Sequence, residues 1–99
     1  MPFSVFYSVR GAKDEIPQVI LEVRRMDVAG MRAQPGFRDA RLMVAEDHTE
    51  AVLVTEWDRR EDFLAYRHTE SGKRNVEAAI HLHPQLSFYD HVALDEAKP

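Results

Sequence analysis

The start of the chain alternates apolar and polar side chains, which is the period of a β-strand. In residues 3–10, every second side chain is apolar, and this set is Phe3, Val5, Tyr7 and Val9. The alternation predicts a strand with one face toward a core. The first ten residues contain no continuous apolar run, so we expect neither a signal peptide nor a membrane span there.

A helical period follows over residues 14–33. Its apolar residues recur at spacings of three and four, which predicts one amphipathic helix with a buried stripe. Asp14 is expected to cap this helix, and Pro17 fits its first turn, where an N–H has no helical partner. Pro35 and Gly36 are expected to end it. The members of the stripe are Ile16, Val19, Ile20, Val23 and Met26.

The second half of the chain predicts a hairpin, a helix and a strand. Residues 37–45 and 51–57 are apolar-rich runs joined by a polar loop, as in an antiparallel hairpin. Asp58 and Glu61 have the spacing of a capping box, so a second helix is expected to start there. We expect it to break around 69–72, to resume and to stop before Pro84. Residues 86–94 predict the last strand, and residues 95–99 a frayed tail.

The predicted order is β-α-β-β-α-β. This order is typical of an α+β, ferredoxin-like domain, in which two helices cover one face of a four-stranded antiparallel sheet. The opposite face also carries apolar side chains, among them Phe6, Val52 and Val54. An apolar sheet face needs a covering layer, and no further segment of the chain supplies one. The sequence therefore predicts a homodimer.

Composition narrows the possible partners. The 99 residues are expected to form one domain over 1–99, since chains of this length rarely divide. The formal net charge of −4 argues against nucleic acid, whose binding surfaces are basic. The chain contains no cysteine, which excludes disulfides and thiol catalysis and is consistent with a reducing compartment. We therefore expect a cytoplasmic protein with no membrane partner.

Three short motifs carry a family resemblance. They are Pro35-Gly36-Phe37 before the second strand, Val54-Thr55-Glu56-Trp57 at the end of the third, and the helix start that runs from Asp58 to Tyr66. In these motifs and in element order, the chain resembles the antibiotic biosynthesis monooxygenase family. The resemblance implies a dimeric α+β barrel in which each subunit keeps a pocket between its sheet and its helices.

The resemblance leaves three functions open. Several members oxidise phenols, anthrones or quinols with dioxygen and no cofactor, so we first expect a cofactor-independent monooxygenase acting on a small aromatic molecule. The second possibility is a related barrel that binds a small ligand without turnover. The third is haem degradation, for which relatives use a histidine late in the second helix and an asparagine on the first strand. Lys73-Arg74-Asn75-Val76 and Tyr7-Ser8 stand there instead, which disfavours haem.

Candidate site residues lie at the expected junction of sheet and second helix. Oxidation of a phenol needs a base that works near neutral pH and aromatic pocket walls. We expect His68, at the helix break, to be the base, and Tyr66 to be a polar catalytic group. The alternatives are a surface position for His68, a half-buried tyrosine with a hydrated hydroxyl for Tyr66, and simple core packing for Trp57. The expected substrate contacts are Trp57, Tyr7, Phe63 and Phe37.

The other four histidines have weaker claims. His48 is expected in solvent in the hairpin loop, and His91 lies on the last strand. His81 and His83 alternate as metal ligands on one strand face can, but no third ligand has a suitable spacing. We therefore predict no metal site.

Overall fold

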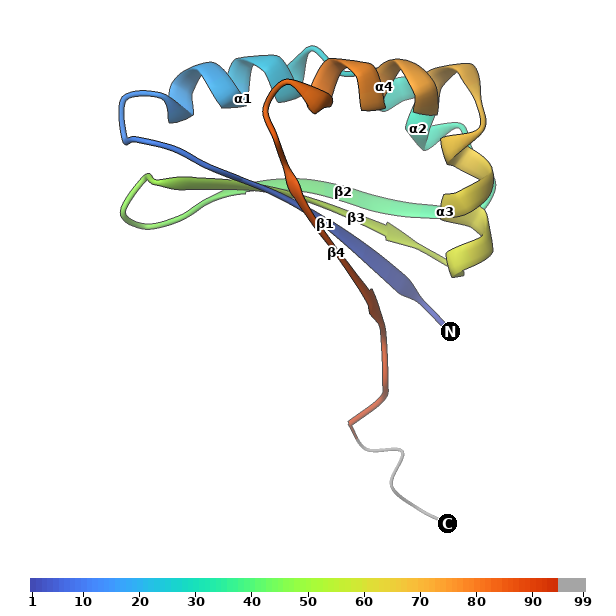
Figure 1. Cartoon of the computed structure of the whole chain (residues 1–99). Helices are drawn as coiled ribbons and strands as arrows, with labels where there is room; N and C mark the ends of the chain where they lie inside the picture. Colours follow the sequence, from blue (N-terminus) through green and yellow to red (C-terminus); the bar gives the residue numbers. More distant parts are fainter. Residues whose placement is uncertain (95–99) are drawn as a thin grey trace.

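The computed structural model describes residues 1–94 and shows an antiparallel sheet with helices on one face (Figure 1). The strands are β1 (Phe3–Arg10), β2 (Phe37–Val44), β3 (Glu50–Trp57) and β4 (Gln85–Asp90), in the spatial order β2-β3-β1-β4. The helices are α1 (Ile16–Arg24), α2 (Val28–Arg32), α3 (Arg60–Arg67) and α4 (Glu70–Ile80). The predicted ferredoxin-like α+β fold is confirmed. The expected frayed tail, 95–99, lies outside the described residues.

The single helix expected over residues 14–33 is two helices. α2 begins after Asp27, whose carboxylate accepts a hydrogen bond from the N–H of Gly30 at 2.9 Å. An aspartate that caps the amides of a new first turn competes with continuation of the preceding helix. The expected cap at Asp14 is also wrong, because the N-cap of α1 is Glu15 and no side chain caps this helix. Pro17 does lie in the first turn.

The capping box expected at the second helix does not form. α3 starts at Arg60, with Arg59 in an extended conformation as its N-cap and no side-chain cap. The Asp58 carboxylate instead lies 3.3 Å from the guanidinium of Arg38. The box was therefore offset by one residue from the true helix start, and Glu61 simply adds negative charge to the first turn of α3.

A helix break was expected around 69–72; the break is present, but it lies slightly earlier, at His68 and Thr69, and residues 70–72 already belong to α4. The side chain of Thr69 accepts a hydrogen bond from the N–H of Gly72 at 3.0 Å and so caps α4. The last strand was expected over 86–94. β4 begins one residue earlier, at Gln85, and ends four residues earlier, at Asp90.

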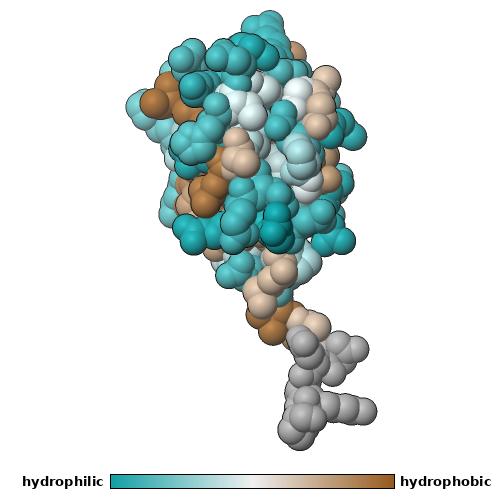
Figure 2. All heavy atoms as spheres, turned by 90° about the vertical axis from the view of Figure 1, so that its right-hand side faces the viewer, coloured by the Kyte–Doolittle hydropathy of each residue, from teal (hydrophilic) through white to brown (hydrophobic). Residues whose placement is uncertain are grey.

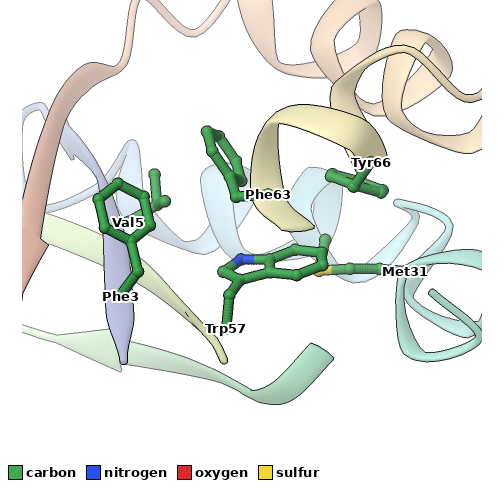
Figure 3. Packing of buried hydrophobic residues seen from close by; sticks show 6 residues of the cluster. All are labelled: Phe3, Val5, Met31, Trp57, Phe63 and Tyr66. Carbon is green, nitrogen blue, oxygen red and sulfur yellow. The ribbon is translucent and has the colours of Figure 1, made fainter. Parts of the chain in front are cut away.

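The register of the sheet decides which side chains face the helices. Phe3, Val5 and Val9 of β1 are buried on that side, as their alternation predicted. Two clusters make up the core: one consists of Phe3, Val5, Met31, Trp57, Phe63 and Tyr66, and the other of Val9, Ile16, Val19, Val23 and Ala51. The first cluster fixes α3 on the end of β3, with the indole of Trp57 lying beneath Phe63 and Tyr66 and beside Met31 (Figure 3).

The outer face of the sheet has no helix over it in the described part of the chain (Figure 1). Phe6 packs edge-on against Tyr89 there, with 5.1 Å between ring centroids. Met43 and Tyr89 are 45% and 53% exposed on this face. Seen from the end at which α3 lies, the surface is mostly hydrophilic, with a few hydrophobic side chains between the polar ones (Figure 2).

Candidate functional site

A cavity of about 330 Å³ lies between the sheet and the helices. Its lining comes from all four strands and from α1, α2, α3 and α4, and most of it is aliphatic. An apolar cavity with a few convergent polar groups is the usual form of a small-molecule site. The polar side chains in the lining are Tyr7, Tyr66, Arg67, Asn75 and His83.

Tyr66 and Asn75 form a buried polar pair in this cavity. Nδ2 of Asn75 donates a hydrogen bond to the Tyr66 hydroxyl at 2.7 Å, and the two residues are only 3% and 7% exposed. The backbone N–H of Asp27 donates to Oδ1 of Asn75 at 2.8 Å. Because that N–H can only donate, it fixes which side of the amide carries the oxygen. The phenol oxygen of Tyr66 thus accepts a hydrogen bond from Asn75 and retains its own O–H as a donor.

Asp27, the N-cap residue of α2, holds this pair in place. Its backbone oxygen accepts a second hydrogen bond from Asn75 at 3.2 Å. Its carboxylate accepts from the N–H of Gly30 and, at 3.0 Å, from the guanidinium of Arg74. These hydrogen bonds, chiefly that from Gly30 and then that from Arg74, hold the pKa of the Asp27 carboxyl below its usual value. α2 and α4 are therefore tied together at the residue that orients Tyr66.

Both tyrosines of the cavity are neutral hydrogen-bond donors at physiological pH. Burial raises the pKa of the Tyr66 hydroxyl above the ordinary 10.0, although the hydrogen bond from Asn75 opposes this rise. Burial also raises the pKa of Tyr7, and the proximity of Tyr66 raises it further because two phenolates would repel each other.

These shifts predict a loss of stability in alkali. Tyr7 and Tyr66 bind their protons more tightly in the folded chain than in the unfolded one, so the free energy of unfolding falls as pH rises above 10.0. Below that pH, the ionisation of these two groups does not change the free energy of unfolding. Urea unfolding at about pH 7, 10 and 11 should show a smaller fall between the last two for Tyr7→Phe than for the wild type. Tyr89→Phe, at an exposed position, is the control, and a fall equal to that of wild type in Tyr7→Phe would contradict the argument.

All of the predicted site residues except His68 fall into two neighbouring groups. Tyr7 and Tyr66 line the cavity. Trp57, Phe63 and Phe37 lie in the aromatic cluster behind Tyr66 rather than in the lining: Trp57 is 0% exposed, and its ring centroid lies 5.2 Å from Tyr66 and 5.9 Å from Phe63. Phe37 packs edge-on against Trp57 at 5.5 Å. These three side chains support the wall that carries Tyr66.

His68 is exposed at the C-cap of α3 and does not line the cavity. Its backbone is helical, and its N–H donates to the carbonyl of Ala65, which continues the turn of α3. Since Tyr66 occupies the buried face of this helix, a residue two positions later points away from that face. The helix break therefore does not turn His68 inwards.

Among the histidines, His83 lines the cavity. It is exposed and has a positive φ of 52° at the turn into β4, so it stands at the cavity mouth. Of the others, His81 lies 3.1 Å from Glu22, and His91 lies 2.6 Å from the Ser4 hydroxyl. No three His, Cys, Asp or Glu side chains gather as metal ligands within residues 1–94. Nor is any helix in that range long and apolar enough to cross a bilayer.

Asn75 was not selected from the sequence as a site residue. It lies four residues before Ala79, so it shares a helix face with an apolar position that packs inward. That a polar amide falls on this face was the available signal. Its partner Asp27 lies 48 positions away, and no spacing rule connects the two.

The sequence profile described as antibiotic biosynthesis monooxygenase matches residues 2–78. The match runs from β1 through most of α4 and includes Tyr7, Tyr66 and Asn75. The chain belongs to this family. The predicted resemblance is confirmed, and the family is named for monooxygenase activity. No curated protein matches the sequence significantly.

Solved structures share the fold of this family member. Rv0793 from Mycobacterium tuberculosis is 18% identical with a TM-score of 0.71, covering 99% of this chain and 100% of its own. An ethyl tert-butyl ether D family protein from Bacillus halodurans is 15% identical with a TM-score of 0.74, covering 93% and 100%. An antibiotic biosynthesis monooxygenase is 22% identical with a TM-score of 0.67, covering 94% and 100%. At these identities, the similarity establishes the fold alone.

Proposed function

We propose that this chain is a cofactor-independent monooxygenase that oxidises a phenolic, anthrone or quinol-type aromatic molecule with dioxygen. The observation that carries the proposal is the buried Tyr66–Asn75 pair in a cavity that is otherwise mostly aliphatic. Such a cavity accepts a flat apolar ring, and the one oriented phenol proton selects a ligand oxygen. Membership of a family named for monooxygenases supports the reaction class.

The reaction requires the substrate to become an anion. An anthrone that loses a proton forms a phenolate-like anion, which reduces dioxygen. Its CH₂ carbon becomes a carbonyl that contains one oxygen atom, and the other oxygen leaves with two hydrogens as water. Tyr66 donates its proton in a hydrogen bond to the substrate oxyanion, and Asn75 holds the phenol in that direction. Such a donor stabilises a developing charge more strongly in an apolar cavity than in water.

A proton acceptor must also reach the substrate. His83 lines the cavity, whereas His68, our candidate from the sequence, does not. A neutral imidazole at the mouth can take the proton and pass it to solvent. In this proposal, Tyr66 keeps the catalytic role expected of it, and His83 takes the role of base.

Tyr66→Phe tests the proposal directly. It removes the donor and leaves the ring, so we expect kcat/KM for oxidation of dithranol, a dihydroxyanthrone, to fall by roughly tenfold to a hundredfold. Oxygen consumption and the appearance of the quinone measure the rate. Tyr89→Phe removes an exposed hydroxyl outside the cavity and should retain the wild-type rate.

Three results would count against this function. If no anthrone or quinol is oxidised faster in air with the protein than without it, the monooxygenase proposal fails. If dithranol binds but is never turned over, and Tyr66→Phe lowers its affinity alone, the chain is a ligand-binding module. If hemin gives a shifted Soret band that the Tyr66→Phe variant alters, the haem alternative is favoured instead.

The chain is also proposed to act as a homodimer through the outer face of its sheet. Proteins of the family are commonly dimeric. Phe6, Val52 and Val54 lie on that face, beside the exposed Met43 and Tyr89. In a single chain Val54 is already buried, but Met43 and Tyr89 are left to water, and a second copy would bury them.

Phe6→Asp should dissociate this dimer, because a carboxylate would have to be buried without a partner. Light scattering should give twice the 11.4 kDa of one chain for the wild type and a single-chain mass for the variant. Leu21→Asp changes an exposed leucine on α1 and should remain dimeric. A folded wild-type chain that stays single at micromolar concentration would contradict the dimer.

A further inference from the structure

A second hollow of about 370 Å³ lies at the N-terminal end of β1, beside α3. We call it the arginine groove. Three phenylalanine rings form its floor: Phe88 lies 6.2 Å from Phe3 and 6.0 Å from Phe63, centroid to centroid. Phe3 and Phe63 are buried, but Phe88 is 49% exposed. The ring that a ligand can reach is therefore mainly that of Phe88, with Phe3 and Phe63 packed beneath it.

Two arginines line the arginine groove, and the guanidinium of Arg67 lies over the ring of Phe63, 5.9 Å from its centroid. Arg60 and Arg67 are the first and last residues of α3, two helical turns apart and on one face. Within residues 1–94, neither guanidinium forms an ion pair. Asp90 is the one carboxylate in the lining, so the lining keeps an excess positive charge on a chain whose formal net charge is −4.

The groove adjoins the main cavity through Arg67, which lines both hollows. Both lie over the same helix-facing side of the β1–β4 pair. Tyr7 and its partner Leu86 line the cavity, while Phe3 and Phe88 line the groove. From Tyr7 to Phe3 the strand advances by four residues, roughly 13 Å. A ligand that occupies both hollows must be elongated.

We infer that the arginine groove binds a carboxylate carried by an elongated aromatic substrate, whose phenolic ring occupies the main cavity. Guanidinium groups bind carboxylates through paired, charge-assisted hydrogen bonds, and the rings of the floor contact the adjacent hydrocarbon. Asp90 repels the carboxylate from its end of the groove and so restricts it to the side of α3. The identity of the ring rests on the proposed function, but the recognition of the carboxylate does not.

A matched ligand pair tests the inference on the full chain. Rhein is a dihydroxyanthraquinone with a carboxyl group, and chrysophanol carries a methyl group in its place. Titration calorimetry should show rhein binding roughly tenfold more tightly than chrysophanol, with a preference that weakens as salt is added. Arg60→Gln and Arg67→Gln should each remove most of that preference. Arg60 lies outside the main cavity, so Arg60→Gln should leave chrysophanol affinity within about twofold of wild type.

Arg59→Gln is the control, because Arg59 is adjacent in sequence but lies outside the groove and pairs with Asp62 at 3.5 Å. It should keep the preference for rhein. Equal affinity for the two compounds, no binding of either, or a preference that survives Arg60→Gln and Arg67→Gln together would overturn the inference.

The same experiments separate this inference from the proposed function. Both probes are quinones that need no oxidation to bind. A preference for rhein without oxidation of dithranol sustains the groove and removes the monooxygenase. Oxidation of dithranol without any preference for rhein does the reverse.

Discussion

Trp57→Ala is expected to lower the free energy of unfolding by about 3–5 kcal/mol, the largest effect we predict for a side-chain truncation. The indole is 0% exposed and contacts rings from β2 and α3, so its removal leaves a cavity that rigid neighbours cannot fill. Its N–H donates to the Thr55 hydroxyl at 3.0 Å, and this buried hydrogen bond is lost as well. Urea unfolding followed by circular dichroism measures the change.

Leu21→Ala is the control for this truncation, because Leu21 is 45% exposed and its removal should cost less than about 1 kcal/mol. A loss at Trp57 no larger than that at Leu21 would mean that α3 is held mainly by other contacts. Trp57→Phe should fall between the two, since the ring remains but the hydrogen bond to Thr55 does not.

Gly72→Ala is expected to destabilise the chain by about 1–3 kcal/mol or more, even though it adds a single methyl group. A Cβ at this position would lie 2.1 Å from the carbonyl oxygen of Tyr66 and 3.0 Å from Cα of Arg67. These are backbone atoms, which cannot rotate away as the end of a side chain can. α4 would have to move from α3, and the hydrogen bond between Asn75 and Tyr66 would lengthen.

Two measurements test Gly72→Ala, namely urea unfolding and the binding of chrysophanol to the cavity. We expect both to weaken. Gly11→Ala is the control, because its Cβ would meet only the side chain of Glu15, at 3.3 Å. Wild-type stability in Gly72→Ala would show that α3 and α4 can separate at little cost.

The alternation of the strands predicted the fold well, because Phe3, Val5 and Val9, which it placed toward the core, are buried. The hairpin strands, expected over 37–45 and 51–57, lie over residues 37–44 and 50–57. Pro35 and Gly36 ended the helical region as predicted, and Gly36 adopts a φ of +81°, where side chains other than hydrogen are strained. Periodicity sufficed here because it reports directly on which face is buried.

Helix ends were predicted less well, because capping depends on local geometry that short motifs share. Asp27 reads as one more polar residue in an amphipathic helix, and only its bonds to Gly30 and to Asn75 make it the start of α2. Asp58 has the sequence of a cap but pairs with Arg38 across the sheet edge. Contacts between residues far apart in the sequence, such as Asp27 with Asn75 and Asp58 with Arg38, leave no periodic signal.

The candidate site was predicted in part for the same reason. Tyr7 and Tyr66 could be placed toward a pocket because each lies on the buried face of its element. The orientation of His68 depended on where α3 ends, and a shift of one or two residues turns a helical side chain to the opposite face. Asn75 enters the site through its hydrogen bonds to Asp27 and Tyr66 on other elements, which a single sequence does not reveal.

The place of β1 in the sheet order imposes a sequence of events on synthesis. The first strand of this sheet to be synthesised is central, and its two neighbours are residues 50–57 and 85–90. The hairpin of β2 and β3 is the earliest local pairing available, while β1 waits unpaired with apolar side chains on both faces. The last partner of β1 is β4, so the sheet closes only after residues 85–90 have been made. A nascent fragment that stops after α4 would therefore offer one open edge of β1 to chaperones or to other unfinished chains.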